Sequence, residues 1–275
     1  MQKRIISGAV YVAILTTLFL LREFVDIRFF DLFIYFLMVV GTFEMARATK
    51  SLTIKGSTIL SILYALALIP TYYIFENVLF FDYGKLAVFY LFALMTVINL
   101  VLAVLFNAQP KKLFWTILLY VYPAILLFLM YLTNRTNVHA FIMLVLAFVI
   151  SPISDTFAYF VGTLIGGKKL CPRLSPKKTW SGAIGGTIGG ILSSIIVYVI
   201  FKPQINSSSP VMFFLLLGIL ASIVNIFGDL FESFIKRKVG IKDMGKIMPG
   251  HGGVLDRIDG TMFVMLIIYI MFLFV

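Results

Sequence analysis

Long, uninterrupted apolar segments restrict this chain of 275 residues to few possible folds. A helix needs about 20 mostly apolar residues to cross about 30 Å of hydrocarbon. Because these segments are continuously apolar and do not alternate, they predict helices and not the strands of a membrane β-barrel. We therefore expect an all-α, polytopic transmembrane bundle of about nine spanning helices. The nine segments are Ile5 to Leu21, Phe29 to Ala46, Gly56 to Phe75, Leu86 to Phe106, Leu113 to Leu132, Val138 to Leu164, Trp180 to Phe201, Val211 to Ile235 and Asp259 to Val275.

The composition excludes several classes of protein. The chain is 61% hydrophobic and 13% charged, whereas soluble domains are about 45–50% apolar and about 25% charged. This excludes a soluble enzyme, a disordered protein and a secreted disulfide scaffold. The single cysteine, Cys171, excludes an internal disulfide and a cysteine-based metal site. Leu-Leu-Arg-Glu follows the first apolar segment in place of a small-residue cleavage site, so we expect a retained span and not a signal peptide.

The basic residues predict the orientation in the membrane. With nine spans, the N-terminus and alternate loops share one side, and this side carries eighteen of the 23 Lys and Arg residues. Cytoplasmic loops are enriched in Lys and Arg. We therefore expect a cytoplasmic N-terminus and a multi-pass protein of the inner (cytoplasmic) membrane. The same rule accounts for the net charge of +11, so we expect no nucleic-acid partner.

Two cytoplasmic loops are more basic than this rule requires. Residues 165–179 and 236–258 hold eleven of the eighteen basic residues on that side. The excess favours an anionic ligand over simple contact with anionic lipid. We therefore divide the chain into an N-terminal transmembrane region of about five helices, residues 1–137, and a catalytic transmembrane region of about four helices, residues 138–275, which carries both loops.

Carboxylates within apolar segments indicate a functional site. Asp155, Asp229 and Glu232 lie within or at the ends of such segments, where a charge at the membrane centre costs about 2.5–3.5 kcal/mol on insertion scales. In the eighth segment, Asn225, Asp229, Glu232 and Lys236 follow helical spacing and form one polar stripe. This stripe faces protein or a water-filled cavity, either as part of a site or as a hydrogen-bonded seam between helices.

Glu44 is a further carboxylate in an apolar segment. It lies one helical turn before Arg47, and residues three or four apart on a helix are neighbours. A structural ion pair with Arg47 and a functional role are both open for this residue.

The last apolar segment is too short to cross a membrane alone. Thr261 to Val275 comprises only 15 residues, or about 22 Å of helix. The helix therefore has to begin near Asp256, which places Asp256 and Asp259 at its N-terminal end, where carboxylates are favoured. With Asp229 they would form a cluster that stays ionised only around a cation, and Mg²⁺ takes carboxylates, phosphate oxygens and water. We predict a metal–phosphate site at Asp229, Asp256 and Asp259, with a second cation as an open alternative.

Two patterns near these carboxylates predict phosphate binding. A Pro-Gly-His-Gly-Gly turn at residues 249–253 lets backbone N–H groups approach a ligand closely. Upstream, Lys177 and Lys178 precede Thr179 and the start of a helix, whose N-terminus adds donors for phosphate. The spacing of a Walker A loop is absent. The basic residues around the carboxylates are Lys236, Arg237, Lys242, Lys246, His251 and Arg257.

Glycines recur every fourth residue along the seventh apolar segment. Gly182, Gly186 and Gly190 share one helical face, with Gly185 and Gly189 beside them. Small residues at this spacing let helix backbones approach closely. The pattern therefore predicts a helix-packing face and not a ligand site.

These motifs resemble the signature of the phosphatidate cytidylyltransferase (CDP-diacylglycerol synthase) family. A second block, from Asp155 to Tyr159 and from Ser175 to Gly182, is also similar to the family. Outside residues 151–190 and 225–260 the similarity is limited to hydrophobic character, and Ser181 and Met248 are slightly atypical. The signature residues are Ser233, Lys236, Arg237, Lys242, Asp243, Gly245, Pro249, His251, Gly252, Gly253, Asp256, Arg257 and Asp259.

The resemblance implies Mg²⁺-dependent transfer of CMP from CTP to phosphatidic acid, which gives CDP-diacylglycerol and pyrophosphate in phospholipid biosynthesis. It also implies that Lys177 and Lys178 bind the pyrophosphate portion of CTP. A phosphate monoester is already nucleophilic near pH 7, so His251 is expected to position groups or balance charge and not to act as a general base. The expected partners are CTP, phosphatidic acid, the bilayer and, as an open alternative, a second copy of the chain.

The site residues expected from this resemblance form three sets. The catalytic set is Asp229, Asp256, Asp259, Lys236, Arg237, His251 and Arg257. In it, Lys236, Arg237 and Arg257 would orient the lipid phosphate. The metal ligands would be Asp229, Asp256 and Asp259. The substrate-binding set is Asp155, Tyr159, Lys168, Ser175, Lys177, Lys178, Thr179, Lys242, Asp243, Gly252 and Gly253.

Three other functions fit the sequence less well. A transporter would show repeated halves and charges near the membrane centre, whereas the two halves differ here and the polar groups crowd one end. A CTP-dependent polyprenol kinase would share a nucleotide site but would need a base for its alcohol acceptor. A CDP-alcohol phosphotransferase needs an Ala-Arg pair downstream of its aspartates, which is missing after Gly260.

Overall fold

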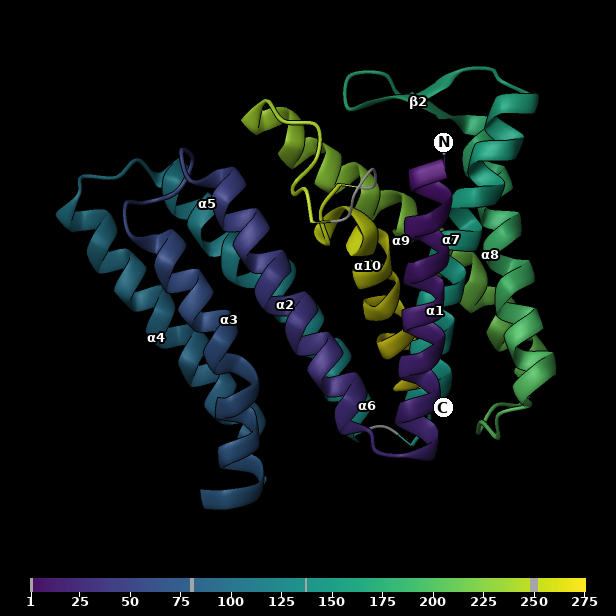
Figure 1. The fold of residues 1–275 in the computed structure, drawn as a ribbon, viewed down its shortest axis with the longest axis horizontal. Helices are drawn as coiled ribbons and strands as arrows, with labels where there is room; N and C mark the ends of the chain where they lie inside the picture. The colour runs from purple at the N-terminus through teal and green to yellow at the C-terminus, as the bar shows by residue number, and fades with distance from the viewer. Residues whose placement is uncertain (1, 80–81, 137, 248–251) are drawn as a thin grey trace. The chain divides into compact units, whose positions relative to one another are not determined.

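The computed structural model describes residues 2–79, 82–136, 138–247 and 252–275. These residues are almost entirely helical, as the apolar segments predict (Figure 1). The exception is a short antiparallel hairpin, β1 (Lys169–Cys171) and β2 (Ser175–Thr179). The helices are α1 (Gln2–Phe24), α2 (Arg28–Thr49), α3 (Ser57–Ile74), α4 (Gly84–Leu105), α5 (Pro110–Leu119), α6 (Leu126–Thr136), α7 (Ala140–Leu164), α8 (Trp180–Phe201), α9 (Pro210–Val239) and α10 (Leu255–Phe272), with π-helical turns at Phe75–Leu79 and Tyr120–Ile125.

Seven helical segments of the described chain are long and apolar enough to cross a membrane. They are α2, α3 with its π-helical extension, α4, the continuous stretch Pro110–Arg135, α7, α8 and α9. The first and last predicted spans are also helical, as α1 and α10. The start of α10 at Leu255 confirms that this helix extends upstream to include Asp256 and Asp259. The polytopic membrane architecture is therefore confirmed.

The chain folds into two compact units, each of which is built from two separate segments of the sequence. The first comprises Met1–Tyr131 and Val239–Asp256, and the second comprises Leu132–Lys238 and Arg257–Val275. In the first unit, α2 packs against α1 and α3, and α3 packs against α4. Fully buried aromatic rings fill this core, with Tyr64 and Tyr120 edge to face at a centroid distance of 5.0 Å.

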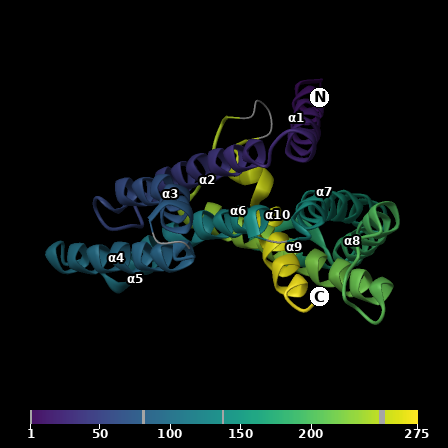
Figure 2. The same cartoon turned by 90° about the horizontal axis from the view of Figure 1, so that it is seen from below.

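The second unit is built on the close packing of α7 and α8, which lie side by side in both views (Figure 1, Figure 2). A Cβ atom at Gly182 would lie 2.8 Å from the carbonyl oxygen of Ala158, and one at Gly186 would lie 3.1 Å from that of Ser154. The fourth-residue glycine pattern is thus confirmed as a packing face, although Gly182 also lines the cavity described below. Gly190 continues it toward α9, where its Cβ would lie 2.9 Å from the carbonyl oxygen of Gly218.

The basic loop at residues 165–179 has more structure than the sequence predicts. After α7, Gly166 and Gly167 have φ values of 67° and 102°, a left-handed backbone that glycine tolerates. The chain then forms the hairpin, with Lys169 opposite Thr179. Thr179 ends β2 and caps α8, because its Oγ1 accepts a hydrogen bond of 3.1 Å from Gly182 N. The hairpin thereby holds two lysines at the N-terminus of α8.

Candidate active site

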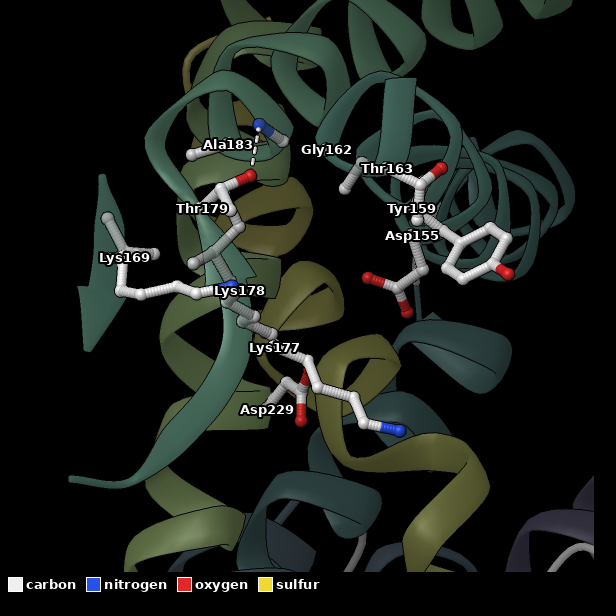
Figure 3. Close-up of a pocket in the computed structure, with 14 residues that line it drawn as sticks. Asp155, Tyr159, Gly162, Thr163, Lys169, Lys177, Lys178, Thr179, Ala183 and Asp229 are labelled. Carbon is white, nitrogen blue, oxygen red and sulfur yellow. Dashed lines mark hydrogen bonds and ion pairs between the residues drawn. The ribbon is translucent and has the colours of Figure 1, made fainter. Parts of the chain in front are cut away.

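A cavity of about 650 Å³ lies in the second unit, between α7, the hairpin, α8 and α9. Its volume is within the range of small-molecule sites, about 300–1,000 Å³. Figure 3 shows the carboxylate of Asp155 projecting from α7 toward the lysines of β2. The polar and charged side chains that line it include Asp155, Tyr159, Lys169, Lys177, Lys178 and Asp229.

The carboxylate of Asp155 is held by a chain of hydrogen bonds that runs from the cavity to a buried serine. Asn225 Nδ2 donates to Asp155 Oδ1 at 2.8 Å. Ser151 Oγ, one turn before Asp155 on α7, donates to Asn225 Oδ1 at 2.7 Å. Asn225 is 0% exposed, and a Cβ atom at Gly260 would collide with its Oδ1. A buried amide that is itself held by a hydrogen bond gives the carboxylate a defined direction.

The polar stripe of α9 serves both as part of the candidate site and as a hydrogen-bonded seam between helices, the two alternatives that the sequence left open. Asn225 forms the hydrogen-bonded seam with α7, whereas Asp229, one turn on, lines the cavity. Asp229 is ion-paired with Lys178 of β2. Their side chains are 33% and 24% exposed, so the pair is partly solvated and contributes only modestly to the stability of the fold.

Acidic groups from three helices gather in this unit. Asp155 is within electrostatic range of Asp229 and Asp259. Asp259, on α10, is within electrostatic range of Glu232 of α9, and its Oδ1 accepts from Gly260 N at 2.9 Å. Lys236 Nζ lies 2.9 Å from Glu232 Oε2 and offsets part of this charge. The sequence grouped Asp229 with Asp259 but did not place Asp155 in the same cluster.

Asp256 belongs to the first unit, where it organises the loop before α10. Its Oδ2 accepts hydrogen bonds from Met244 N and Gly253 N, both at 2.8 Å. Gly252 has a φ of 91°, and a Cβ there would lie 2.8 Å from the same oxygen. This carboxylate therefore ties together Met244 and Gly253, two described residues of the loop at residues 240–254, here called the signature loop, which precedes the helix that also carries Asp259.

The remaining predicted residues occupy several positions. Lys168 is exposed and is not among the residues that line the cavity, whereas Lys169 does line it. Lys169 begins β1, whereas Lys168 lies just before the strand, and no signal in the sequence distinguished the two lysines. Arg237 Nε donates to the carbonyl oxygen of Leu174 at 3.4 Å. His251 lies outside the described residues. Ser175 begins β2, and Lys242, Asp243 and Arg257 are exposed.

The donor chemistry of the cavity fits Mg²⁺ only with help from a ligand. Among the described residues, no group of three His, Cys, Asp or Glu side chains could hold a metal ion by itself. Mg²⁺ usually binds one or two carboxylates and completes its octahedron with phosphate oxygens and water. Asp155 and Asp229, which line the same cavity, supply that number of carboxylates.

Comparison with known proteins identifies the family. The model of the Cytidylyltransferase family matches residues 2–275. The chain belongs to the cytidylyltransferase family. It is 43% identical to a protein of Brucella abortus over 130 residues. These residues make up 47% of this chain and 46% of that protein. It is 42% identical to a protein of Thermotoga maritima over 125 residues. These residues make up 44% of this chain and 45% of that protein.

A third cytidylyltransferase relative matches over a longer segment. The Rickettsia conorii protein is 39% identical over 170 residues, which cover 60% of this chain and 71% of that protein. All three relatives are named phosphatidate cytidylyltransferase. The matched segment spans about half the length of the Brucella and Thermotoga proteins.

Proposed function

We propose that this member of the cytidylyltransferase family transfers CMP from CTP to phosphatidic acid and releases pyrophosphate and CDP-diacylglycerol for phospholipid biosynthesis. The observation that carries the proposal is the cavity in which Asp155 and Asp229 face Lys177 and Lys178. The names of the relatives support the choice of substrates. The concentration of Lys and Arg in loops 165–179 and 236–258 supports a cytoplasmic location for the site.

The hairpin and the start of α8 provide a phosphate-binding wall for CTP. Lys169, Lys177 and Lys178 line the cavity, and Thr179 caps the helix N-terminus beside them. Ammonium groups and a helix N-terminus both stabilise phosphate. In this proposal Lys178 leaves Asp229 for the β- and γ-phosphates, which keeps the pyrophosphate in place as it departs.

Asp155 and Asp229 are the proposed Mg²⁺ ligands best supported by the cavity, with Asp256 and Asp259 as the further carboxylates proposed from the signature. When bound, Mg²⁺ supplies charge neutralisation and Lewis-acid polarisation of the phosphates. Asn225 keeps Asp155 directed into the cavity. The release of Asp229 from Lys178 then makes its carboxylate available at the same moment as the nucleotide phosphates arrive.

The acceptor chemistry needs orientation more than proton removal. A phosphatidate oxygen forms a bond to the α-phosphorus of CTP, and the bond from that phosphorus to the β-phosphate bridging oxygen breaks. The phosphate monoester attacks as an anion, so no side chain has to act as a base. Lys236, Arg237 and Arg257 are proposed to orient the lipid phosphate. His251 is proposed to balance charge in the signature loop.

A reconstituted assay tests this proposal. We expect purified protein in detergent, given Mg²⁺, phosphatidic acid and labelled CTP, to form lipid-extractable label and pyrophosphate in equal amounts. Chelation of Mg²⁺ and the Asp256→Asn variant should each abolish both products, because charge neutralisation and the signature loop would be lost. Label that stays in water with all components present would reject the proposal, and a polyprenol acceptor would be tested next.

The Asn225 hydrogen bonds predict a graded effect. Asn225→Leu keeps a similar volume but removes both bonds that direct Asp155. We expect kcat to fall about 10- to 100-fold, the usual range for a group that orients a ligand, with KM for phosphatidic acid nearly unchanged. Ser222→Ala is the matched control, because this buried serine on α9 bonds the backbone of its own helix. Equal kcat values for Asn225→Leu and the wild type would contradict the positioning role.

A further inference from the structure

The N-terminus of α10 is capped by a side chain from a helix far away in the sequence. Glu44 of α2 accepts hydrogen bonds from Val254 N at 3.2 Å and from Leu255 N at 2.9 Å, across sequence separations of 210 and 211 residues. Both nitrogens lie at the start of α10, where N–H groups have no partner within the helix. Glu44 is 1% exposed, so its carboxylate depends on these bonds in place of water.

Glu44 supplies the helix cap because the residue at the usual capping position of α10 has no side-chain acceptor. Helices are usually capped by Ser, Thr, Asp or Asn at the residue before the first turn. In α10 that position is Val254, whose side chain cannot accept a hydrogen bond. The carboxylate of Glu44 therefore supplies both the acceptors and the negative charge that a helix N-terminus favours.

Two glycines of the loop before α10 lie in close contact with the Glu44 carboxylate. A Cβ atom at Gly253 or at Gly245 would collide with the Glu44 carboxylate, so a side chain at either position would push this carboxylate out of its present place. Arg47, one turn later on α2, donates from Nη2 to the carbonyl oxygen of Met244 at 3.0 Å. The sequence left open an ion pair between Glu44 and Arg47, and the structure instead directs both side chains to the loop backbone.

Glu44 and Asp256 bind neighbouring parts of the same loop. Asp256 Oδ2 accepts from Met244 N and Gly253 N, whereas Glu44 accepts from the next two residues after Gly253. If the Glu44 bonds were lost, the start of α10 and the backbone donors around Asp256 would be free to move. The direction of the Asp256 carboxylate therefore depends on a residue of α2.

We propose that Glu44 is a positioning residue for cytidylyl transfer: by capping α10 it holds the signature loop and the Asp256 carboxylate in their working arrangement. The catalytic part of this inference rests on the proposed function. It gives α2 a direct role in ordering the residues around Asp256, although the signature motifs lie entirely in the C-terminal half of the chain.

Amide hydrogen exchange and kinetics together test this role. In Glu44→Gln one of the two N–H groups faces an amide donor and loses its acceptor. We expect the amides of Val254 and Leu255 in the purified protein to exchange about 10- to 100-fold faster, as for the loss of a hydrogen bond to a charged group. We also expect kcat to fall about 10- to 100-fold, the Mg²⁺ concentration for half-activation to rise, and KM for phosphatidic acid to stay within about twofold.

Thr42→Val is the matched control. Thr42 is 0% exposed on the same helix, and its hydroxyl has no hydrogen-bond partner among the described residues. This nearly isosteric change should leave exchange, kcat and Mg²⁺ half-activation unaltered. If Glu44→Gln does not fold, Gly253→Ala provides the same test from the other side of the contact, since its methyl group pushes against the carboxylate. Its effect on kcat should be smaller in a Glu44→Ala background.

The outcomes separate this inference from the proposed function. Unchanged amide exchange and unchanged kcat in Glu44→Gln, beside an active wild type, would overturn the positioning role and leave the proposed function intact. Equal effects of Gly253→Ala in both backgrounds would also overturn it. Faster exchange in Glu44→Gln beside a wild type that forms no CDP-diacylglycerol would support the cap and reject the proposed function together with its catalytic consequence.

Discussion

Asp229→Asn is expected to lower kcat for CDP-diacylglycerol formation by at least about 10³-fold, because groups that merely orient a metal ligand already contribute about 10- to 100-fold. Asparagine has nearly the same shape as aspartate but no charge, so it can neither balance Lys178, its ion-pair partner in the structure, nor bind Mg²⁺ strongly. The measurement is steady-state turnover of labelled CTP at saturating phosphatidic acid, repeated over a range of Mg²⁺ concentrations.

A parallel variant separates two roles for Asp229. If this carboxylate served only to hold Lys178, then Lys178→Met and Asp229→Asn would have the same kinetic effect. We expect them to differ: Lys178→Met should mainly raise KM for CTP, since Lys178 lines the cavity beside Lys177, whereas Asp229→Asn should lower kcat and raise the Mg²⁺ requirement. Glu23→Gln, an exposed carboxylate at the end of α1, is the control and should keep full activity.

Gly218→Leu is expected to prevent the second unit from folding normally. A Cβ atom at Gly218 would lie 2.7 Å from Ile191 Cα and 2.8 Å from the carbonyl oxygen of Gly190. These are backbone atoms of α8, so a side chain cannot be accommodated by a change of rotamer and the two helices must separate. Overpacking typically costs about 1–3 kcal/mol, and the upper end of this range would lower the melting temperature by roughly 6–12 °C in a chain of this size.

The yield of monodisperse protein in detergent and its melting temperature measure this effect. Gly218→Ala should give an intermediate loss, since only the Cβ is added. Gly8→Leu is the matched control, because Gly8 lies in α1 and has nothing within 4 Å of its Cβ position. A Gly218→Leu variant that melts with the wild type would show that α8 and α9 do not approach each other as closely as the structure indicates.

Features that depend on one helix alone could be predicted from the sequence. The apolar segments predicted the helices because the bilayer sets their length and composition. The upstream start of α10 at Leu255 followed from the same length requirement. The glycine face of α8 was predicted from its spacing, because small residues four apart necessarily share one side of a helix.

Features that depend on which helices become neighbours could not. The sequence placed Asp229 and Asn225 on one face of a helix but did not identify Asp155 as their partner on α7. It also predicted a basic loop at residues 165–179 without any strand, whereas β1 and β2 form a hairpin there and Lys169 and Lys178 line the cavity. Helical and strand periodicity report the direction of a side chain around its own axis, and they carry no information about the lateral order of helices.

Glu44 shows the difference most clearly. The sequence by itself determined that this carboxylate lies on an apolar helix and needs a partner, because an unpaired buried charge is costly. It determined equally that the signature loop contains glycines and that the last helix begins near Asp256. Only the tertiary structure decided that these three features meet, with Glu44 bonded to Val254 and Leu255, because the pairing joins segments about 210 residues apart that only the packing of the helices brings together.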